Sequence, residues 1–191
     1  QIRVFGKMVT NGYLYKGLKP VYWCPTCETA LAEAEVEYAD HTSNSIYIKF
    51  AVPDSERSKL PQFVSEAKNG AANTNEKTPV SFVAWTTTPW TLPANLAIAL
   101  HPDFIYEFIT TPDHGVLVVA QSLRETFLQA ADIDAAAVTV LGVATGRELE
   151  LIEARHPFVD RASRVINGAH VTNEAGTGVV HTAPGHGPED F

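Results

Sequence analysis

Apolar and polar residues alternate along much of the chain, a period of two that is typical of half-buried β-strands. In the clearest example, Ile46, Ile48 and Phe50 alternate with a tyrosine and a lysine. The segment 32–38 is rich in Ala and Glu, which favour helix, but its glutamates alternate with apolar residues, so we interpret it as a strand. Similar reasoning predicts strands at 80–85, 96–100, 104–110, 116–120, 138–143 and 176–181, and weaker ones at 147–153 and 163–172.

Helical spacing is confined to a few segments. Leu123, Phe127 and Leu128 share one face of a predicted helix at 122–130, which Ser122 is placed to cap. A short helix near 57–68 is predicted to precede a loose polar loop, whereas residues 1–20 show no sustained period. Many short strands with few helices predict an α+β fold that is mostly β, a barrel-like domain of short strands with small peripheral helices.

Composition and charge narrow the classes of protein. The 191 residues are 45% hydrophobic, enough for one core. No apolar run approaches the ~20 residues of a membrane span, and no signal peptide is recognisable. The net charge of −8 excludes a domain that holds a nucleic acid backbone by itself. Two cysteines favour a reducing compartment, and a first residue other than Met leads us to expect a fragment or a processed product.

The segment 85–95, WTTTPWTLPAN, concentrates uncharged hydrogen-bonding groups in one turn. It holds four threonine hydroxyls, an indole and a carboxamide, and two prolines stiffen it. Such a cluster suits a pocket that orients water and a polar ligand without a charge of its own. The alternative is that the hydroxyls satisfy backbone groups in a tight bend.

A second motif lies at 181–190, HTAPGHGPED. A strand is predicted to end at His181, and two glycines then permit tight backbone. Pro188 suits the first position of a helix, so that Asp190 in its first turn would stay ionised and bind a substrate ammonium. The alternative is a structural loop with a capping carboxylate. We expect a structural or surface role for His186, which lies between the glycines.

Together with the segment 23–38, WCPTCETALAEAEVEY, these two motifs resemble the editing domain of isoleucyl-tRNA synthetase, which is inserted into a class I catalytic core. The resemblance covers essentially the whole chain. Related valine and leucine enzymes typically read Thr-Thr-Arg-Pro-Glu/Asp-Thr in the first motif, whereas this chain has Thr88 and Trp90 at the distinguishing positions. The HIGH-like and KMSKS-like signatures of the catalytic core are absent from the sequence, so we expect neither productive ATP binding nor tRNA charging.

The resemblance implies hydrolysis of valyl-tRNA(Ile), the wrongly charged product, and of valyl-adenylate. One methylene is worth only ~1–3 kcal/mol in a hydrophobic pocket, a magnitude for which the isoleucine enzyme is itself the standard example. A second, hydrolytic sieve is therefore needed. No residue resembles a covalent nucleophile with a partnered base, so we expect directed attack by water.

The resemblance also implies roles for individual residues. Asp190 pairs with the α-ammonium of the substrate, while His181 and Trp90 form walls of the side-chain pocket, with His181 limiting its size. Asn95 supports the loop or contacts the substrate. The hydroxyls that bond the terminal adenosine, the ester region and the attacking water are those of Thr86, Thr87 and Thr88.

Cys24 and Cys27 form a CxxC pair that is compatible with two kinds of chemistry. A thioredoxin-type motif requires a helix that begins at the first cysteine, which the alternation at 32–38 disfavours. A CxxC pair is also half of a four-ligand zinc site, for which His41 is only an isolated candidate. In the family a second pair lies beyond the editing domain, so the resemblance implies an incomplete zinc site here.

We therefore expect a connecting ribbon segment with the CxxC pair at 1–40 and an editing domain at 41–191. The expected partners are the 3′ end of tRNA(Ile) charged with valine, valyl-adenylate and the rest of the synthetase chain. We expect a cytoplasmic monomer without a membrane partner and without a cofactor in these residues, with zinc in the full-length protein and ATP only in the catalytic core. The alternatives are a non-catalytic β-barrel that binds the tRNA end and a CxxC thiol redox or zinc module.

Overall fold

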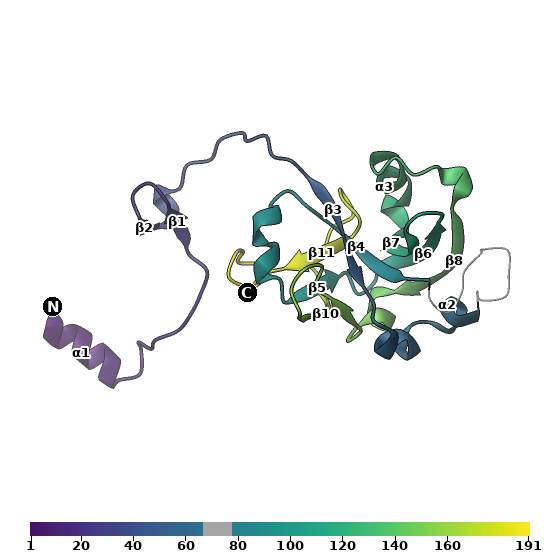
Figure 1. Cartoon of the computed structure of the whole chain (residues 1–191). Coiled ribbons are helices and arrows are strands. Elements are labelled where there is room, and N and C mark those ends of the chain that lie inside the picture. The colour runs from purple at the N-terminus through teal and green to yellow at the C-terminus, as the bar shows by residue number, and fades with distance from the viewer. Residues whose placement is uncertain (67–77) are drawn as a thin grey trace.

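The computed structural model describes residues 1–66 and 78–191, and strands dominate the second of these ranges (Figure 1). Two mixed sheets form the body of the protein. The strands of the first sheet, in spatial order, are β3 (Ile46–Ala51), β4 (Val80–Thr86), β7 (Gly115–Ala120), β6 (Ile105–Thr111) and β8 (Thr139–Thr145). Those of the second are β11 (Val179–Thr182), β5 (Ala97–Leu100), β10 (Ala162–Asn167) and β9 (Glu153–Arg155).

The expectation of a mostly β fold with small helices is confirmed, but the described strands close no barrel. The first sheet ends at β3 and β8, which do not pair with each other, and the second ends at β11 and β9. The pairs β4–β7 and β5–β10 are parallel, and the other pairs within these two sheets are antiparallel. Two open sheets therefore replace the expected barrel.

The main hydrophobic core takes side chains from both sheets. Phe50, Phe82 and Phe108 of the first sheet and Ile98 and Val165 of the second belong to one buried cluster. A smaller cluster lies on the opposite face of the first sheet, where Leu117 of β7 meets the buried side chains of α3 (Arg124–Ala130). Strand β4 is buried on both faces, which explains why its sequence is mostly apolar instead of alternating.

The N-terminal part of the chain contributes no buried side chain before Phe50. It contains α1 (Ile2–Thr10) and a hairpin of β1 (Tyr22–Cys24) and β2 (Thr29–Leu31), both of which lie apart from the two sheets in Figure 1. The sequence reasoning missed α1. No helix in the described ranges is long and apolar enough to cross a membrane.

The buried hydroxyl of Tyr106 links the two sheets. It accepts a hydrogen bond from the backbone of His101 at 2.9 Å and donates one to the carbonyl of Gly178 at 2.7 Å. Burial raises the pKa of this phenol well above its usual value. Gly178 has a φ of +69°, and a Cβ there would lie 2.5 Å from that of Ala120, so the close approach before β11 requires glycine.

Two strand predictions are wrong for a common reason, because a glutamate closes a local turn in each case. At 32–38 the structure has only the 3₁₀ helix η1 (Glu33–Glu35), in which the carboxylate of Glu35 accepts from Ala32 N at 2.7 Å. At 147–153 the chain forms η7 (Gly146–Leu149) before β9, and Glu148 accepts from Thr145 N at 2.7 Å. The positive φ of 67° at Leu151 then interrupts any extended run.

The other predicted elements are found with shifted ends. The strands at 46–50, 80–85, 96–100, 104–110, 116–120 and 138–143 are confirmed, and those at 163–172 and 176–181 are shorter, because β10 ends at Asn167 and β11 begins at Val179. The helix at 57–68 is split into η2 (Asp54–Lys59) and α2 (Gln62–Glu66), and residues 67–77 of the predicted loop lie outside the described residues.

Ser122 lies within η5 (Gln121–Leu123) rather than capping α3. One further 3₁₀ turn is η6 (Ala135–Ala137).

Candidate functional site

Strand β4 leads directly into the threonine-rich turn, whose second half is the 3₁₀ helix η4 (Pro89–Ala94). The buried Thr86 accepts a hydrogen bond from the backbone of Thr88 at 3.0 Å, and Thr91 donates to the carbonyl of Thr88 at 2.9 Å. These two hydroxyls therefore organise the bend, as the structural alternative predicts. The side chains of Thr87 and Thr88 are exposed. The Thr88 hydroxyl lies 3.3 Å from that of Thr86, whereas the Thr87 hydroxyl makes no hydrogen bond among the described residues.

One buried hydrogen bond joins the two sequence motifs. His181 lies on β11, in register with Ile98 of β5, and its Nε2 is 3.0 Å from the hydroxyl of Thr91. A threonine hydroxyl has a single proton, and that of Thr91 is already donated to the carbonyl of Thr88. Nε2 of His181 is therefore the donor, and Nδ1 is an unprotonated acceptor, buried without a partner in the part of the chain that is described.

His181 is held in its neutral form. Burial lowers the pKa of its imidazole, because a charged ring is poorly solvated there, and the carboxylate of Asp190 opposes this effect only in part. The neighbouring imidazoles of His156 and His186 lower the pKa of His181 further, because protonation of His181 close to either ring is unfavourable. His181 is thus a buried, uncharged hydrogen-bonding group next to the threonine turn.

Asp190 closes the loop that follows β11. Its Oδ2 accepts from Ala183 N at 2.8 Å, and its side chain remains partly exposed. Residues 188–190 form a turn, and the predicted helix that would begin at Pro188 stays a prediction. His186 is exposed and takes part through its backbone, which donates to the carbonyl of Ala183 at 2.8 Å.

The remaining predicted site residues differ in their surroundings. The Trp90 side chain is 65% exposed, so it does not pack as an inner wall against the buried His181. Asn95 is fully buried, donating from Nδ2 to the carbonyl of Ala97 at 2.8 Å and accepting from the hydroxyl of Ser163. Of the two roles expected for Asn95, this environment fits support of the loop.

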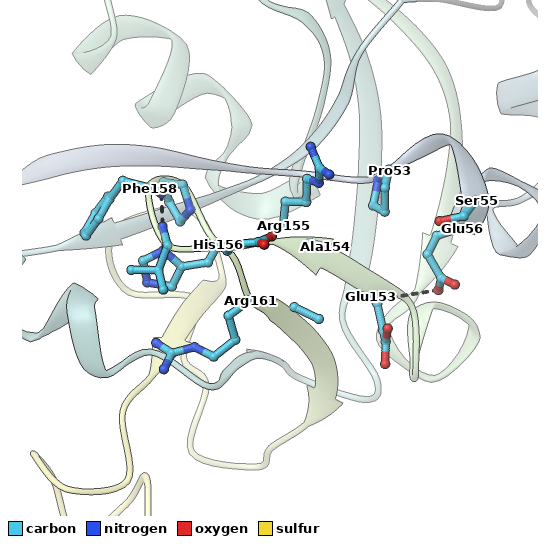
Figure 2. Close-up of a pocket in the computed structure, with 13 residues that line it drawn as sticks. Pro53, Ser55, Glu56, Glu153, Ala154, Arg155, His156, Phe158 and Arg161 are labelled. Atoms are coloured by element: carbon cyan, nitrogen blue, oxygen red, sulfur yellow. Dashed lines mark hydrogen bonds between the residues drawn. The ribbon is translucent and has the colours of Figure 1, made fainter.

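Sequence reasoning missed two residues that hold η4 from its other side. His156 and Arg161 belong to the turn between β9 and β10, which lines a pocket of about 550 Å³ (Figure 2). The imidazole of His156 is 2.7 Å from the carbonyl of Leu92, and Arg161 donates to the carbonyl of Pro93 at 2.7 Å. Both residues lie in a stretch without a recognisable motif, so no sequence signal pointed to them.

Cys24 and Cys27 lie at the tip of the β1–β2 hairpin, as free thiols. The backbone N–H of Cys27 donates to Cys24 Sγ at 3.3 Å, and this lowers the pKa of the Cys24 thiol. No helix begins at Cys24, which disfavours the thioredoxin-type interpretation. No cluster of three or more potential metal ligands occurs in the described ranges, so the zinc expectation stays a prediction.

Acidification from about pH 7 to about pH 5 is expected to destabilise the protein in part through His181. Because its pKa is lower in the folded than in the unfolded state, the unfolded state binds more protons below about pH 6.5, and the stability present at higher pH is lost as the pH falls. The free energy of unfolding, measured in urea at both pH values, should fall less for His181→Gln than for the wild type. As a control, Thr91→Val keeps the imidazole and should therefore retain the acid sensitivity. If the wild type and His181→Gln lost equal stability between the two pH values, His181 would not be a source of the acid sensitivity.

Comparisons with known proteins point to one family. A family model described as tRNA synthetases class I (I, L, M and V) matches residues 1–158. The isoleucine--tRNA ligase of Desulforamulus reducens is 54% identical over 192 residues, which cover 100% of this chain and 18% of that protein. That of Thermoanaerobacter sp. is 52% identical over 191 residues, covering 100% of this chain and 19% of the relative. The chain thus spans less than a fifth of the length of these relatives.

Solved structures show the same fold at low identity. GlLeuRS-CP1 aligns with a TM-score of 0.59 and 18% identity over 77% of this chain and 57% of its own. The editing domain of the P. knowlesi cytosolic leucyl-tRNA synthetase aligns with a TM-score of 0.56 and 13% identity over 75% of this chain and 59% of its own. At this identity, these neighbours show a similar fold and nothing more.

Proposed function

Since the chain belongs to the class I tRNA synthetase family, we propose that it is an editing region that hydrolyses valyl-tRNA(Ile), and also valyl-adenylate, by directed attack of water. The observation that carries this proposal is the buried bond between Thr91 and His181, because it joins the threonine turn and the C-terminal motif into one site. The exposed hydroxyls of Thr87 and Thr88 and the carboxylate of Asp190 then belong to that same site.

The hydrogen-bond pattern argues for activation of water rather than a covalent threonine. A threonine nucleophile needs a base that accepts its proton. His181 instead donates a hydrogen bond to the Thr91 hydroxyl, and that hydroxyl donates its own proton to the Thr88 carbonyl. The rate would therefore come from placement of the water and the ester, and from fixed dipoles around the developing oxyanion.

We assign distinct roles to the three adjacent threonines. Thr86 is buried and organises the bend, whereas Thr87 and Thr88 present exposed hydroxyls for the terminal adenosine, the ester and the water. Asp190 receives the α-ammonium, and the neutral ring of His181 limits the size of the side-chain pocket. Trp90, whose side chain is exposed, is the proposed second wall of that pocket.

The partners follow from charge and from the CxxC pair. With a net charge of −8, this region would receive only the 3′ end of tRNA(Ile), while the rest of a longer synthetase chain holds the body of the tRNA. Cys24 and Cys27 supply two thiols of the four ligands that structural zinc takes, and we propose that the other two come from outside these residues. We also propose that the protein is a monomer in the cytoplasm, a reducing compartment that would keep Cys24 and Cys27 as free thiols.

The proposal is tested by hydrolysis of valyl-tRNA(Ile) with the full-length protein and the 191-residue chain. We expect deacylation of this substrate and sparing of isoleucyl-tRNA(Ile), the matched control that differs by one methylene. Equal hydrolysis of both would overturn the proposed specificity. Binding of the charged 3′ end without hydrolysis by either protein would instead favour the non-catalytic module.

A further inference from the structure

We propose that His156 and Arg161 are positioning residues, which hold η4 so that the threonine hydroxyls and His181 keep the geometry that hydrolysis needs. The proposal rests on the function proposed above, and it concerns residues outside both sequence motifs. Neither residue touches the reacting atoms; both act through the backbone of η4.

The two side chains bind two consecutive carbonyls near the end of a short 3₁₀ helix. Helix η4 has six residues, and 3₁₀ geometry is weak over such lengths. The carbonyl of Leu92 accepts from Asn95 N at 2.9 Å and also from His156 Nε2 at 2.7 Å. Arg161 donates to the next carbonyl, that of Pro93, at 2.7 Å. Consecutive carbonyls are thus held by one turn that is distant in sequence.

His156 is itself fixed in orientation. Its Nδ1 accepts from the backbone N–H groups of Phe158 and Val159 at 3.3 and 3.1 Å, which leaves Nε2 as the nitrogen that donates to Leu92. The ring is 4% exposed and lies edge-on to Phe50 and Phe158, at centroid distances of 6.4 and 4.7 Å. Figure 2 shows Phe158 close to this ring. A donor locked in this way restricts where the Leu92 carbonyl can lie.

A displacement of η4 would change the geometry of the candidate site, because η4 is hydrogen-bonded on both sides. Thr91 binds His181 on one side, and the neighbouring carbonyl of Leu92 binds His156 on the other. A shift of Leu92 would therefore move Thr91, and with it the Thr88 carbonyl to which Thr91 donates. A misplacement of about 1 Å is enough to cost about 100-fold in rate.

The test compares two substitutions of His156 that differ in one hydrogen bond. His156→Gln retains a donor that reaches the Leu92 carbonyl, whereas His156→Asn retains only an acceptor near the Nδ1 position. In the full-length protein we expect His156→Asn to lower kcat for valyl-tRNA(Ile) by about 10- to 100-fold, with KM changed by less than about threefold. His156→Gln should recover most of kcat, and Arg161→Met should repeat the loss that Arg161→Lys avoids.

Hydrogen exchange provides a readout that does not depend on activity. The amides of Thr91 and Asn95 are bonded within the turn and η4, so they should exchange faster in His156→Asn than in the wild type or His156→Gln. An equal loss of kcat in both His156 variants, or unchanged kcat in His156→Asn, would overturn the proposal. If the wild type hydrolyses neither substrate, the proposed function fails, and unchanged exchange at Thr91 and Asn95 would then overturn the positioning role separately.

Discussion

Asp190→Asn is expected to lower kcat/KM for valyl-tRNA(Ile) by about 100-fold or more, because it removes the charge that pairs with the substrate ammonium while keeping the loop closed. Loss of one partner of a hydrogen-bonded charge pair costs about 2–5 kcal/mol. The carbonyl of an asparagine still accepts from Ala183 N, the bond that Asp190 makes at 2.8 Å. The measurement is steady-state deacylation by the full-length protein at neutral pH.

Two further variants separate the effect of the Asp190 charge from other effects of the substitution. Asp190→Ala also removes the bond to Ala183, so we expect it to abolish deacylation and to loosen the loop after β11. Glu189→Gln changes the neighbouring exposed carboxylate and serves as the matched control, with activity expected to stay near that of the wild type. Retention of wild-type activity by Asp190→Asn would exclude a charge role for this residue.

Phe82→Ala is expected to destabilise the protein by about 3–5 kcal/mol, the range for removal of a buried phenylalanine ring. Phe82 is fully buried in the main core and is paired in register with Phe50 on β3 and Val118 on β7. The free energy of unfolding of a domain is only about 5–15 kcal/mol, so this one substitution would remove a large part of the stability. The measurement is urea unfolding at neutral pH.

The matched control is Phe5→Ala in α1, a helix without any buried residue. Surface substitutions of this kind change the free energy of unfolding by about 0.5 kcal/mol or less. Equal effects of the two substitutions would contradict the core assignment. Because β4 leads into the threonine turn, loss of Phe82 should also reduce hydrolysis near the unfolding midpoint, in proportion to the unfolded fraction.

Periodicity predicted the fold well where one physical factor dominated. Strand β4 and its partner β3 were found because burial of apolar residues sets their pattern. The predictions failed at 32–38 and 147–153, where side-chain to backbone bonds from Glu35 and Glu148 closed turns that compete with the extended chain. Helix α1 was missed although Ile2, Phe5 and Val9 follow helical spacing, a signal that was available.

The candidate site was also predictable from the sequence only in part. The motifs pointed to the threonine turn, His181 and Asp190, and the structure brings the turn and the C-terminal motif together through one buried bond. Sequence could not distinguish the three adjacent threonines, because burial separates Thr86 from Thr87 and Thr88. The exposure of Trp90 and the complete burial of Asn95 also required the folded chain.

The sequence by itself determined the mostly β character, the family resemblance and the two segments of the candidate site, because these depend on local patterns and on residue identity. Only the tertiary structure decided that the sheets stay open, that Nε2 of His181 is a donor, and that His156 and Arg161 hold η4 from the opposite side. The openness of the sheets depends on which strands pair, and the bonds of His181, His156 and Arg161 join residues more than 60 positions apart. No local pattern records either kind of contact.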